Sequence, residues 1–142
     1  MIVDTTYLLP LSRISIDTDL LRAIAENEIA DVGLEDLGVS SISIFELQAK
    51  AAKLKVKAEY VSGAVSSISD NFRVEPFHSP TIIKSSFELK NMFSDYIDCI
   101  IVGTAVSLIE DLITEDSKIL DKKDILHDKF GVNVSSYSTL TK

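Results

Sequence analysis

Four acidic side chains occupy positions where a metal-dependent reaction could use them: Asp4, Glu46, Asp98 and Asp116. Asp4 follows a short apolar, β-branched segment, and Asp116 follows another (LIT), so both are expected just past the carboxyl ends of strands. Asp98 and Glu46 fall near the amino ends of predicted helices. Because ligands of an open α/β sheet bind at the carboxyl ends of its strands, we expect the four carboxylates to meet at one edge.

Carboxylates gathered in this way favour hard divalent cations, namely Mg²⁺ or Mn²⁺. Without a cation the four groups would repel one another. One or two ions would remove that repulsion, activate a water molecule and stabilise the charge that builds on a phosphodiester during in-line attack. We expect Thr6 or Thr114 to support such a site by holding the ion's water or the nucleophile through hydrogen bonds.

Three of the four acids, all but Asp116, also have a purely structural interpretation, and so does Asp95. Asp98, in the first turn of a helix, can be a cap, and Asp4 can cap the helix that follows it. Glu46 can be a solvated surface acid. Asp95, one helical turn before Asp98, is either an additional ligand or the cap of that helix. These interpretations stay open until the acids are placed in space.

Other kinds of site lack their residues. The five glycines form neither GxGxxG nor GxxxxGK[ST], so both common phosphate-binding loops are missing. His78 and His127 lie far apart in polar segments, and the single Cys99, inside an apolar run, is expected to be a core thiol. These residues therefore lack the spacing of a zinc site. No GxSxG elbow is present, which argues against Ser–His–Asp hydrolysis. Thr5 and Thr6 follow Asp4 where receiver-type and haloacid-type phosphotransfer domains have a second acid, which argues against those domains.

The elements that must position the acids alternate between strands and helices. An amphipathic helix over 17–28 is expected to be capped by Asp17 or Thr18, and others should begin at Ser40 or Ser41 and at Pro80. Residues 1–142 are therefore predicted to form a single α/β domain with a mainly parallel five-stranded sheet, helices on both faces, and Ile2 and Val3 in the central strand. The strands are expected near residues 2–7, 37–40, 73–76, 111–114 and 132–135.

The composition narrows the class of protein. Hydrophobic residues make up 46% of the chain, yet no apolar run reaches membrane-spanning length, and the opening segment carries Asp4 and lacks a basic leader. We therefore expect a cytoplasmic protein without a membrane contact. The net charge of −8 argues against a protein that coats nucleic acid. The densest positive cluster is either a solvated face or an RNA contact, and it comprises Lys50, Lys53, Lys55 and Lys57.

Taken in order, these motifs resemble the PIN-domain family, and most of all its small stand-alone members, the VapC-type ribonucleases. IVDTT at Asp4 is similar to the family's hydrophobic–Asp–[ST]–[ST] opening, and SSISIFELQAKA at Glu46 to its Ser-rich lead into a helix with a Glu. The segment from Asp98 to Ala105 is similar to D-x-x-I-x-x-T-A, Thr114 to Asp116 to T-x-D, and GVNVSSYSTL to the closing strand. The resemblance covers almost the whole chain.

The resemblance implies a Mg²⁺- or Mn²⁺-dependent endoribonuclease. Asp4, Asp98 and Asp116 would be the principal metal ligands, Asp95 an additional one, and Glu46 a ligand or water-orienting group. It also implies cleavage of single-stranded RNA, a homodimer, and an antitoxin protein as partner. Gly103 departs from the family's usual alanine and either loosens its helix or packs it closely.

Two alternatives stay open. The same scaffold could bind RNA or protein without cleaving, or it could be an RNA-processing nuclease outside any toxin system.

For the homodimer, we expect exposed apolar positions in VSGAVSSIS, in SPTIIKSSFELKNMF, and at Leu8 and Leu9.

Overall fold

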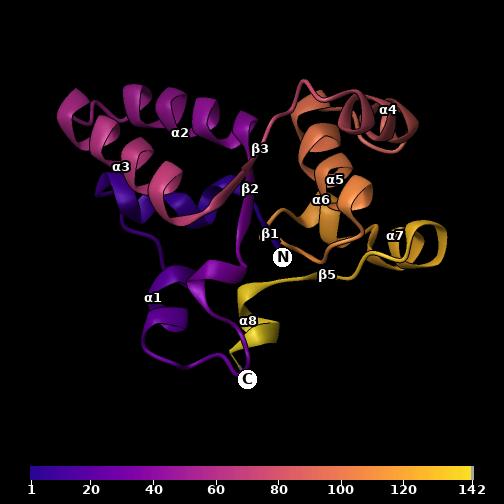
Figure 1. Ribbon diagram of the computed structural model, residues 1–142, viewed down its shortest axis with the longest axis horizontal. Coiled ribbons are helices and arrows are strands. Elements are labelled where there is room, and N and C mark those ends of the chain that lie inside the picture. Colours follow the sequence, from indigo (N-terminus) through magenta and orange to yellow (C-terminus); the bar gives the residue numbers. More distant parts are fainter. Residues whose placement is uncertain (142) are drawn as a thin grey trace.

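The centre of the molecule is a five-stranded sheet in the order β3-β2-β1-β4-β5, shown in the computed structural model, which describes residues 1–141 (Figure 1). Every strand pair is parallel, and the central strand is β1, Ile2–Val3, as predicted. The other strands are β2 (Gly38–Ser40), β3 (Arg73–Glu75), β4 (Leu112–Ile113) and β5 (Val134–Ser135).

Helices cover both faces of the sheet, because successive strand residues point to opposite sides. Val3 and Ile113 belong to one hydrophobic core, whereas Ile2 and Leu112 belong to the other. In Figure 1 the two layers lie left and right of the strands. The first layer contains α1 (Leu20–Ala25), α2 (Ser41–Lys53) and α3 (Ala58–Asn71), and the second contains α4 (Pro80–Leu89), α5 (Tyr96–Leu108), α6 (Ser117–Leu120) and α7 (Lys123–Phe130).

The first strand is shorter than predicted. It ends at Val3, and a 3₁₀ helix, η1 (Thr5–Ser12), follows with Pro10 inside it. The cause is local, because the backbone N–H of Thr5 donates to Oδ1 of Asp4 and turns the chain out of the sheet at once. This turn buries Leu8 and Leu9, so the prediction that these two leucines are exposed was wrong.

Several helix ends fall where the capping residues predict. Ser40 caps α2 and Ser79 caps α4, which has Pro80 in its first turn. The helix predicted over 17–28 is only α1, and its cap is Asp19, whose carboxylate accepts from Arg22 N, rather than Asp17 or Thr18. A second 3₁₀ helix, η2 (Leu34–Asp36), precedes β2.

The end of the chain also differs from the prediction of a single closing strand. After β5 the chain enters a short helix, α8 (Tyr137–Leu140). The backbone N–H of Tyr137 donates to Oε1 of Glu115 instead of to a neighbouring strand. Pairing with β4 therefore stops after Ser135.

The predicted apolar helix is α5, and it packs against α4. A Cβ at Gly103 would lie 2.7 Å from Oγ of Ser86 and 3.0 Å from its backbone nitrogen, so the glycine allows close packing of the two helices. Cys99 is buried in the same helix, as predicted for a core thiol. Among residues 1–141, no helix is long and apolar enough to cross a membrane.

Candidate functional site

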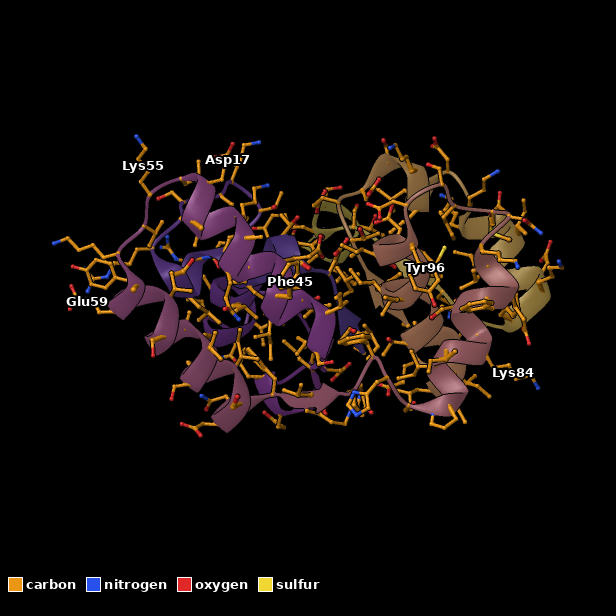
Figure 2. All side chains as sticks on the ribbon, turned by 90° about the horizontal axis from the view of Figure 1, so that it is seen from above. Asp17, Phe45, Lys55, Glu59, Lys84 and Tyr96 are labelled. Carbon is orange, nitrogen blue, oxygen red and sulfur yellow. The ribbon has the colours of Figure 1, made fainter. Side chains whose placement is uncertain are left out.

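A cleft of about 610 Å³ opens at the carboxyl ends of the strands. Its lining includes all four acids named from the sequence, Asp4, Glu46, Asp98 and Asp116. Figure 2 looks down on this edge of the sheet, with Phe45 of the first helical layer on one side and Tyr96 of the second on the other. The sheet topology therefore brings together acids that are more than one hundred residues apart in the chain.

Asp4 lies deepest of the four, with only 9% of its surface exposed. Its Oδ1 accepts from the backbone N–H of Thr5 at 2.7 Å, and its Oδ2 accepts from the hydroxyl of Thr114 at 2.6 Å. Two short hydrogen bonds hold the carboxylate in one orientation and offset part of the cost of its burial.

Glu46 is anchored to the same turn by Thr5. The Thr5 hydroxyl lies 2.6 Å from Oε1 of Glu46 and 2.9 Å from Oγ of Ser43. Since a hydroxyl carries one proton, the short contact is the donation to the carboxylate, and the Ser43 hydroxyl can supply the other bond. Thr5 thus links the turn after β1 to α2. Its backbone N–H orients Asp4 and its hydroxyl orients Glu46.

Asp98 stands in the first turn of α5 but does not cap it. The cap is Asp95, whose Oδ1 accepts from the backbone N–H of Ile97 at 3.0 Å. Asp95 does not appear among the described residues that line the cleft, while Asp98 and Ile97 do. Asp95 therefore caps α5 and Asp98 faces the cleft, while a further role of Asp95 as a metal ligand stays a prediction.

Asp116 caps α6, since its Oδ1 accepts from the backbone N–H of Lys118 at 2.9 Å. The Thr114 hydroxyl accepts from the backbone N–H of Asp116 while it donates to Asp4, so one buried threonine connects both acids. Between them Glu115 accepts from the Tyr7 hydroxyl at 2.7 Å. These bonds tie the loop after β4 to η1.

The carboxylates raise one another's pKa. Burial raises the pKa of Asp98 to about 7, and the charges of Asp116, Asp95, Asp4 and Glu46 add to the shift. Burial also raises the pKa of Asp4, against the lowering effect of its bonds to Thr114 and Thr5, and it raises the pKa of Glu46. The site therefore holds more negative charge than its surroundings compensate.

The donor set fits a hard divalent cation that keeps part of its water. In the part of the chain that the structure describes, no three His, Cys, Asp or Glu side chains lie close enough together to hold one ion directly. Mg²⁺ does not require such a cage, because it retains several waters and uses one or two protein carboxylates. Like charges also keep carboxylates apart where no cation stands between them.

The four lysines named from the sequence separate into two pairs. Lys50 and Lys53 line the cleft, and the charge of Lys50 offsets a small part of the rise that burial causes in the pKa of Glu46. Lys55 and Lys57 lie beyond the end of α2, in the connection to α3, and Figure 2 shows Lys55 at the far end of the molecule from the cleft. Of the two expected supporting threonines, Thr6 lines the cleft and Thr114 lies beneath it.

Sequence reasoning missed Thr5 and Glu115 as parts of this site, and it did not single out Phe45, whose ring is 61% exposed at the rim. The signal for Thr5 was its place directly after Asp4, where a hydroxyl can reach the next helix. No local pattern marks Glu115, because its partners Tyr7 and Tyr137 come from distant elements.

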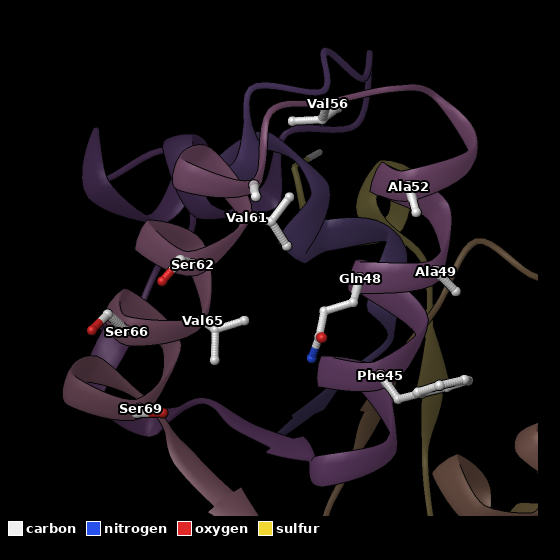
Figure 3. A pocket seen from close by; sticks show the side chains of 11 residues that line it. Phe45, Gln48, Ala49, Ala52, Val56, Val61, Ser62, Val65, Ser66 and Ser69 are labelled. Carbon is white, nitrogen blue, oxygen red and sulfur yellow. The ribbon is translucent and has the colours of Figure 1, made fainter.

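Next to the cleft, α2 and α3 enclose a second hollow, here called the α2–α3 groove, of about 830 Å³. Its walls carry mostly small and apolar side chains from both helices, and Figure 3 shows the amide of Gln48 pointing into it. Phe45 and Ala49 line the groove and the cleft alike.

A family model described as a PIN domain matches residues 1–126. The fold is similar to that of a chain in a structure titled "Toxin-antitoxin complex from Klebsiella pneumoniae", with a TM-score of 0.60, 21% identity, and coverage of 92% of this chain and 93% of that one. It is also similar to a chain of VapBC2 from Rickettsia felis bound to a promoter DNA fragment, with a TM-score of 0.61, 17% identity, and coverage of 95% and 96%. No curated protein matches the sequence.

Proposed function

The chain belongs to the PIN-domain family, and from that membership and the geometry of its cleft we propose that it is a Mg²⁺- or Mn²⁺-dependent endoribonuclease of the cytoplasm. The observation that carries the proposal is the convergence of Asp4, Glu46, Asp98 and Asp116 on one cleft, with burial and mutual repulsion raising the pKa of Asp98 to about 7. Such a cluster of carboxylates destabilises the folded chain, and it can bind a divalent cation.

Each acid has a distinct role in this proposal. Asp4, Asp98 and Asp116 would hold the cation, one or two of them directly and the others through its retained waters, with Asp95 near enough to add negative charge. Such a cation would supply Lewis-acid stabilisation of the phosphodiester and a more acidic water. Glu46, oriented by Thr5, accepts a hydrogen bond from the attacking water and aligns it. The Thr114 hydroxyl keeps Asp4 in a single orientation, and Thr6 lies within the cleft to contact the substrate or its water.

A cleavage assay with single-stranded RNA, with and without Mg²⁺ or Mn²⁺, tests the proposal. We expect Asp4→Asn or Asp98→Asn to lower the rate by at least about 100-fold, because each removes a ligand charge. Asp17→Asn is the matched control, since it removes the same charge from an exposed loop outside the cleft. Wild-type protein that cuts no RNA with either metal, or cleft variants that cut as fast as the control, would refute the enzyme proposal.

The net charge of −8 favours a second candidate, a PIN scaffold that binds RNA or protein without cleaving. Calorimetric titration of Mg²⁺ or Mn²⁺ into the protein, run beside the nuclease assay, separates the two. A silent scaffold predicts no binding of the metal at the acids, whereas the enzyme predicts binding that Asp98→Asn weakens. If the protein is an enzyme but cuts RNA only at defined processing sites, a role outside any toxin system is favoured.

We propose that the partner of this nuclease is an antitoxin protein. Two chains of similar fold come from toxin–antitoxin complexes, and the α2–α3 groove leaves an apolar surface uncovered beside the cleft. The test is co-expression of the chain with the small protein encoded next to it. Growth arrest by the chain alone, relieved by co-expression and absent for Asp4→Asn, is the expected result, while arrest that persists in the Asp4→Asn variant would contradict it.

We also propose a homodimer. Ile83 and Phe87 of α4 and Tyr96 of α5 are at least 42% exposed and lie in one region, where the Phe87 and Tyr96 rings meet edge to face. Covering such a surface with a second copy is favourable. Light scattering at micromolar concentration should give twice the mass of the chain, and Phe87→Glu should give a monomer. A wild-type monomer at that concentration would contradict the proposal.

A further inference from the structure

Phe45 is an exposed aromatic side chain at the entrance to the acidic cleft. It lies on α2 directly before Glu46, and 61% of the residue is exposed, more than for any other phenylalanine among residues 1–141. The buried positions of the same helix are Ser43, Leu47 and Ala51, so the ring contributes nothing to the core of that layer. Its place at the rim therefore needs an explanation other than folding.

The ring stands where the cleft and the α2–α3 groove meet. Phe45 and Ala49 line both hollows. In Figure 3 the ring of Phe45 extends away from α3, on the opposite side of α2 from the Gln48 amide, which points into the groove. The ring thus lies on the side of α2 that faces away from α3, and Phe45 also lines the cleft that holds the carboxylates.

Positive charge follows the ring along the helix. Phe45, Ala49 and Lys53 are spaced four residues apart and form one stripe, with Lys50 beside it, and all four line the cleft. From Phe45 to Lys53 the helix rises by about 12 Å. The helix thus carries an aromatic ring at one end of the stripe and two ammonium groups toward the other. Proteins that bind single-stranded nucleic acid use such an arrangement, because bases stack on the rings and phosphates lie near the cations.

The charge of the cleft makes an uncharged contact especially useful. Five acidic residues line the cleft, the four named acids and Glu115, and their carboxylates repel a phosphate backbone. Lys50 and Lys53 are the lysines among its described lining residues. Stacking of a base on an aromatic ring does not depend on net charge and is tolerant of base identity. A base in a duplex is already stacked and cannot use the ring.

We propose that Phe45 is a base-stacking residue that positions single-stranded RNA beside the carboxylates, an inference that rests on the proposed ribonuclease function. One nucleobase adjoining the scissile phosphate lies on the exposed face of the ring, while Lys50 and Lys53 contact the phosphates next to it. Phe45 acts by binding and placing the strand, and it takes no part in bond cleavage. The enzyme then cuts unpaired RNA in preference to the same sequence in a duplex.

The first test uses the absence of tryptophan from the chain. A Phe45→Trp variant, made with Asp4→Asn so that no cleavage is needed, carries one tryptophan at the rim. Titration with single-stranded RNA of about ten nucleotides should quench its fluorescence, because the indole stacks on a base. Ile125→Trp in the same background is the control, since Ile125 is 44% exposed on α7, away from the described lining of the cleft. The signal of the control should not change.

The second test distinguishes the effect of the aromatic ring of Phe45 from the effect of an apolar side chain of similar size. Phe45→Tyr should keep the wild-type KM for single-stranded RNA, whereas Phe45→Leu and Phe45→Ala should raise it about tenfold with an unchanged melting temperature. An abasic nucleotide next to the cleavage site should raise the KM of wild type by the same factor and leave that of Phe45→Leu unchanged.

Two results would overturn the inference: quenching no greater than in the Ile125→Trp control, or a wild-type KM for Phe45→Leu. If Phe45→Leu loses only the binding of a protein partner, the ring belongs to that contact and the inference also fails. These outcomes are distinct from failure of the proposed function. The fluorescence titration needs no cleavage, whereas the enzyme proposal fails when wild type cuts no RNA or when the Asp4→Asn and Asp98→Asn variants cut as fast as Asp17→Asn.

Discussion

Replacing Asp98 by asparagine should stabilise the metal-free protein at neutral and alkaline pH. Burial and the neighbouring acids raise the pKa of Asp98 to about 7 in the folded chain, against 3.8 for an unperturbed aspartate. The folded state therefore holds this proton more tightly than the unfolded state. The stability that the protonated group contributes is complete below about pH 4, declines as the pH rises, and is lost above about pH 7. Asparagine resembles the protonated form and should remove that decline.

The magnitude follows from the size of the shift. A difference of 7 against 3.8 corresponds to about 4 kcal/mol at 1.36 kcal/mol per pH unit. Asp98 is partly open to the cleft, and screening by water reduces this upper value to about 1–2 kcal/mol. For a chain of this length the melting temperature of Asp98→Asn should exceed that of wild type by roughly 3–6 °C at pH 8.

Thermal unfolding followed by circular dichroism, in EDTA and between pH 4 and pH 8, measures the effect. The gap between Asp98→Asn and wild type should close toward pH 4, while Asp17→Asn, which removes one exposed charge, should follow wild type throughout. Saturating Mg²⁺ at pH 8 should reverse the order, because only wild type keeps the full ligand set. A variant that is less stable than wild type at pH 8 in EDTA would refute the reasoning.

Three further substitutions probe the parts that hold the site. Thr114→Val should cost about 2 kcal/mol in a urea denaturation experiment, because it leaves Oδ2 of the buried Asp4 carboxylate without its donor. Thr114→Ser should cost much less, and equal losses would show that packing, and not the hydroxyl, matters. Gly103→Ala should cost about 1–3 kcal/mol by the same measurement, since its methyl group would meet the backbone of Ser86, and an unchanged midpoint would disprove the close packing. Ile109→Gly should raise the free energy of unfolding by about 1 kcal/mol, because Ile109 ends α5 with a φ of 52°, a left-handed conformation that glycine adopts without strain, and 74% of the residue is exposed. A lower free energy of unfolding would show that the Ile109 side chain makes stabilising contacts.

The order of elements was predictable because the signals for it are local. Apolar β-branched segments mark the strands, and Ser40, Ser79 and Gly131 mark helix ends where the structure has them. The length of the first strand was not predictable in the same way. Residues 5–9 are as apolar and β-branched as a strand, but the Asp4 carboxylate captures the next backbone N–H, and the core accepts Leu8 and Leu9 from a 3₁₀ helix equally well.

The candidate site was predictable as a set of acids but not as a network. Four carboxylates were named from their places at strand and helix ends, and the sheet brings them to one cleft. The hydroxyl groups that orient them depend on contacts between residues far apart in the chain, such as Thr5 with Glu46 and Thr114 with Asp4. Tyr7 holds the neighbouring Glu115 in the same way. Threonine and tyrosine are common in such positions for reasons of packing alone, so their types carry little information until the chain is folded.

The sequence leaves open whether each acid is a helix cap or a functional group, and the two oxygens of a carboxylate make these roles compatible. Asp4 and Asp116 each accept from a backbone N–H with one oxygen, and both still line the cleft. Capping therefore fixes the direction of the side chain and does not exclude it from the site. Asp98 is different, because Asp95 has already taken the cap of α5. Left without that hydrogen bond and surrounded by like charges, Asp98 is the acid whose ionisation the fold opposes through four neighbouring carboxylates, and for the same reason it is the one that a cation should change most.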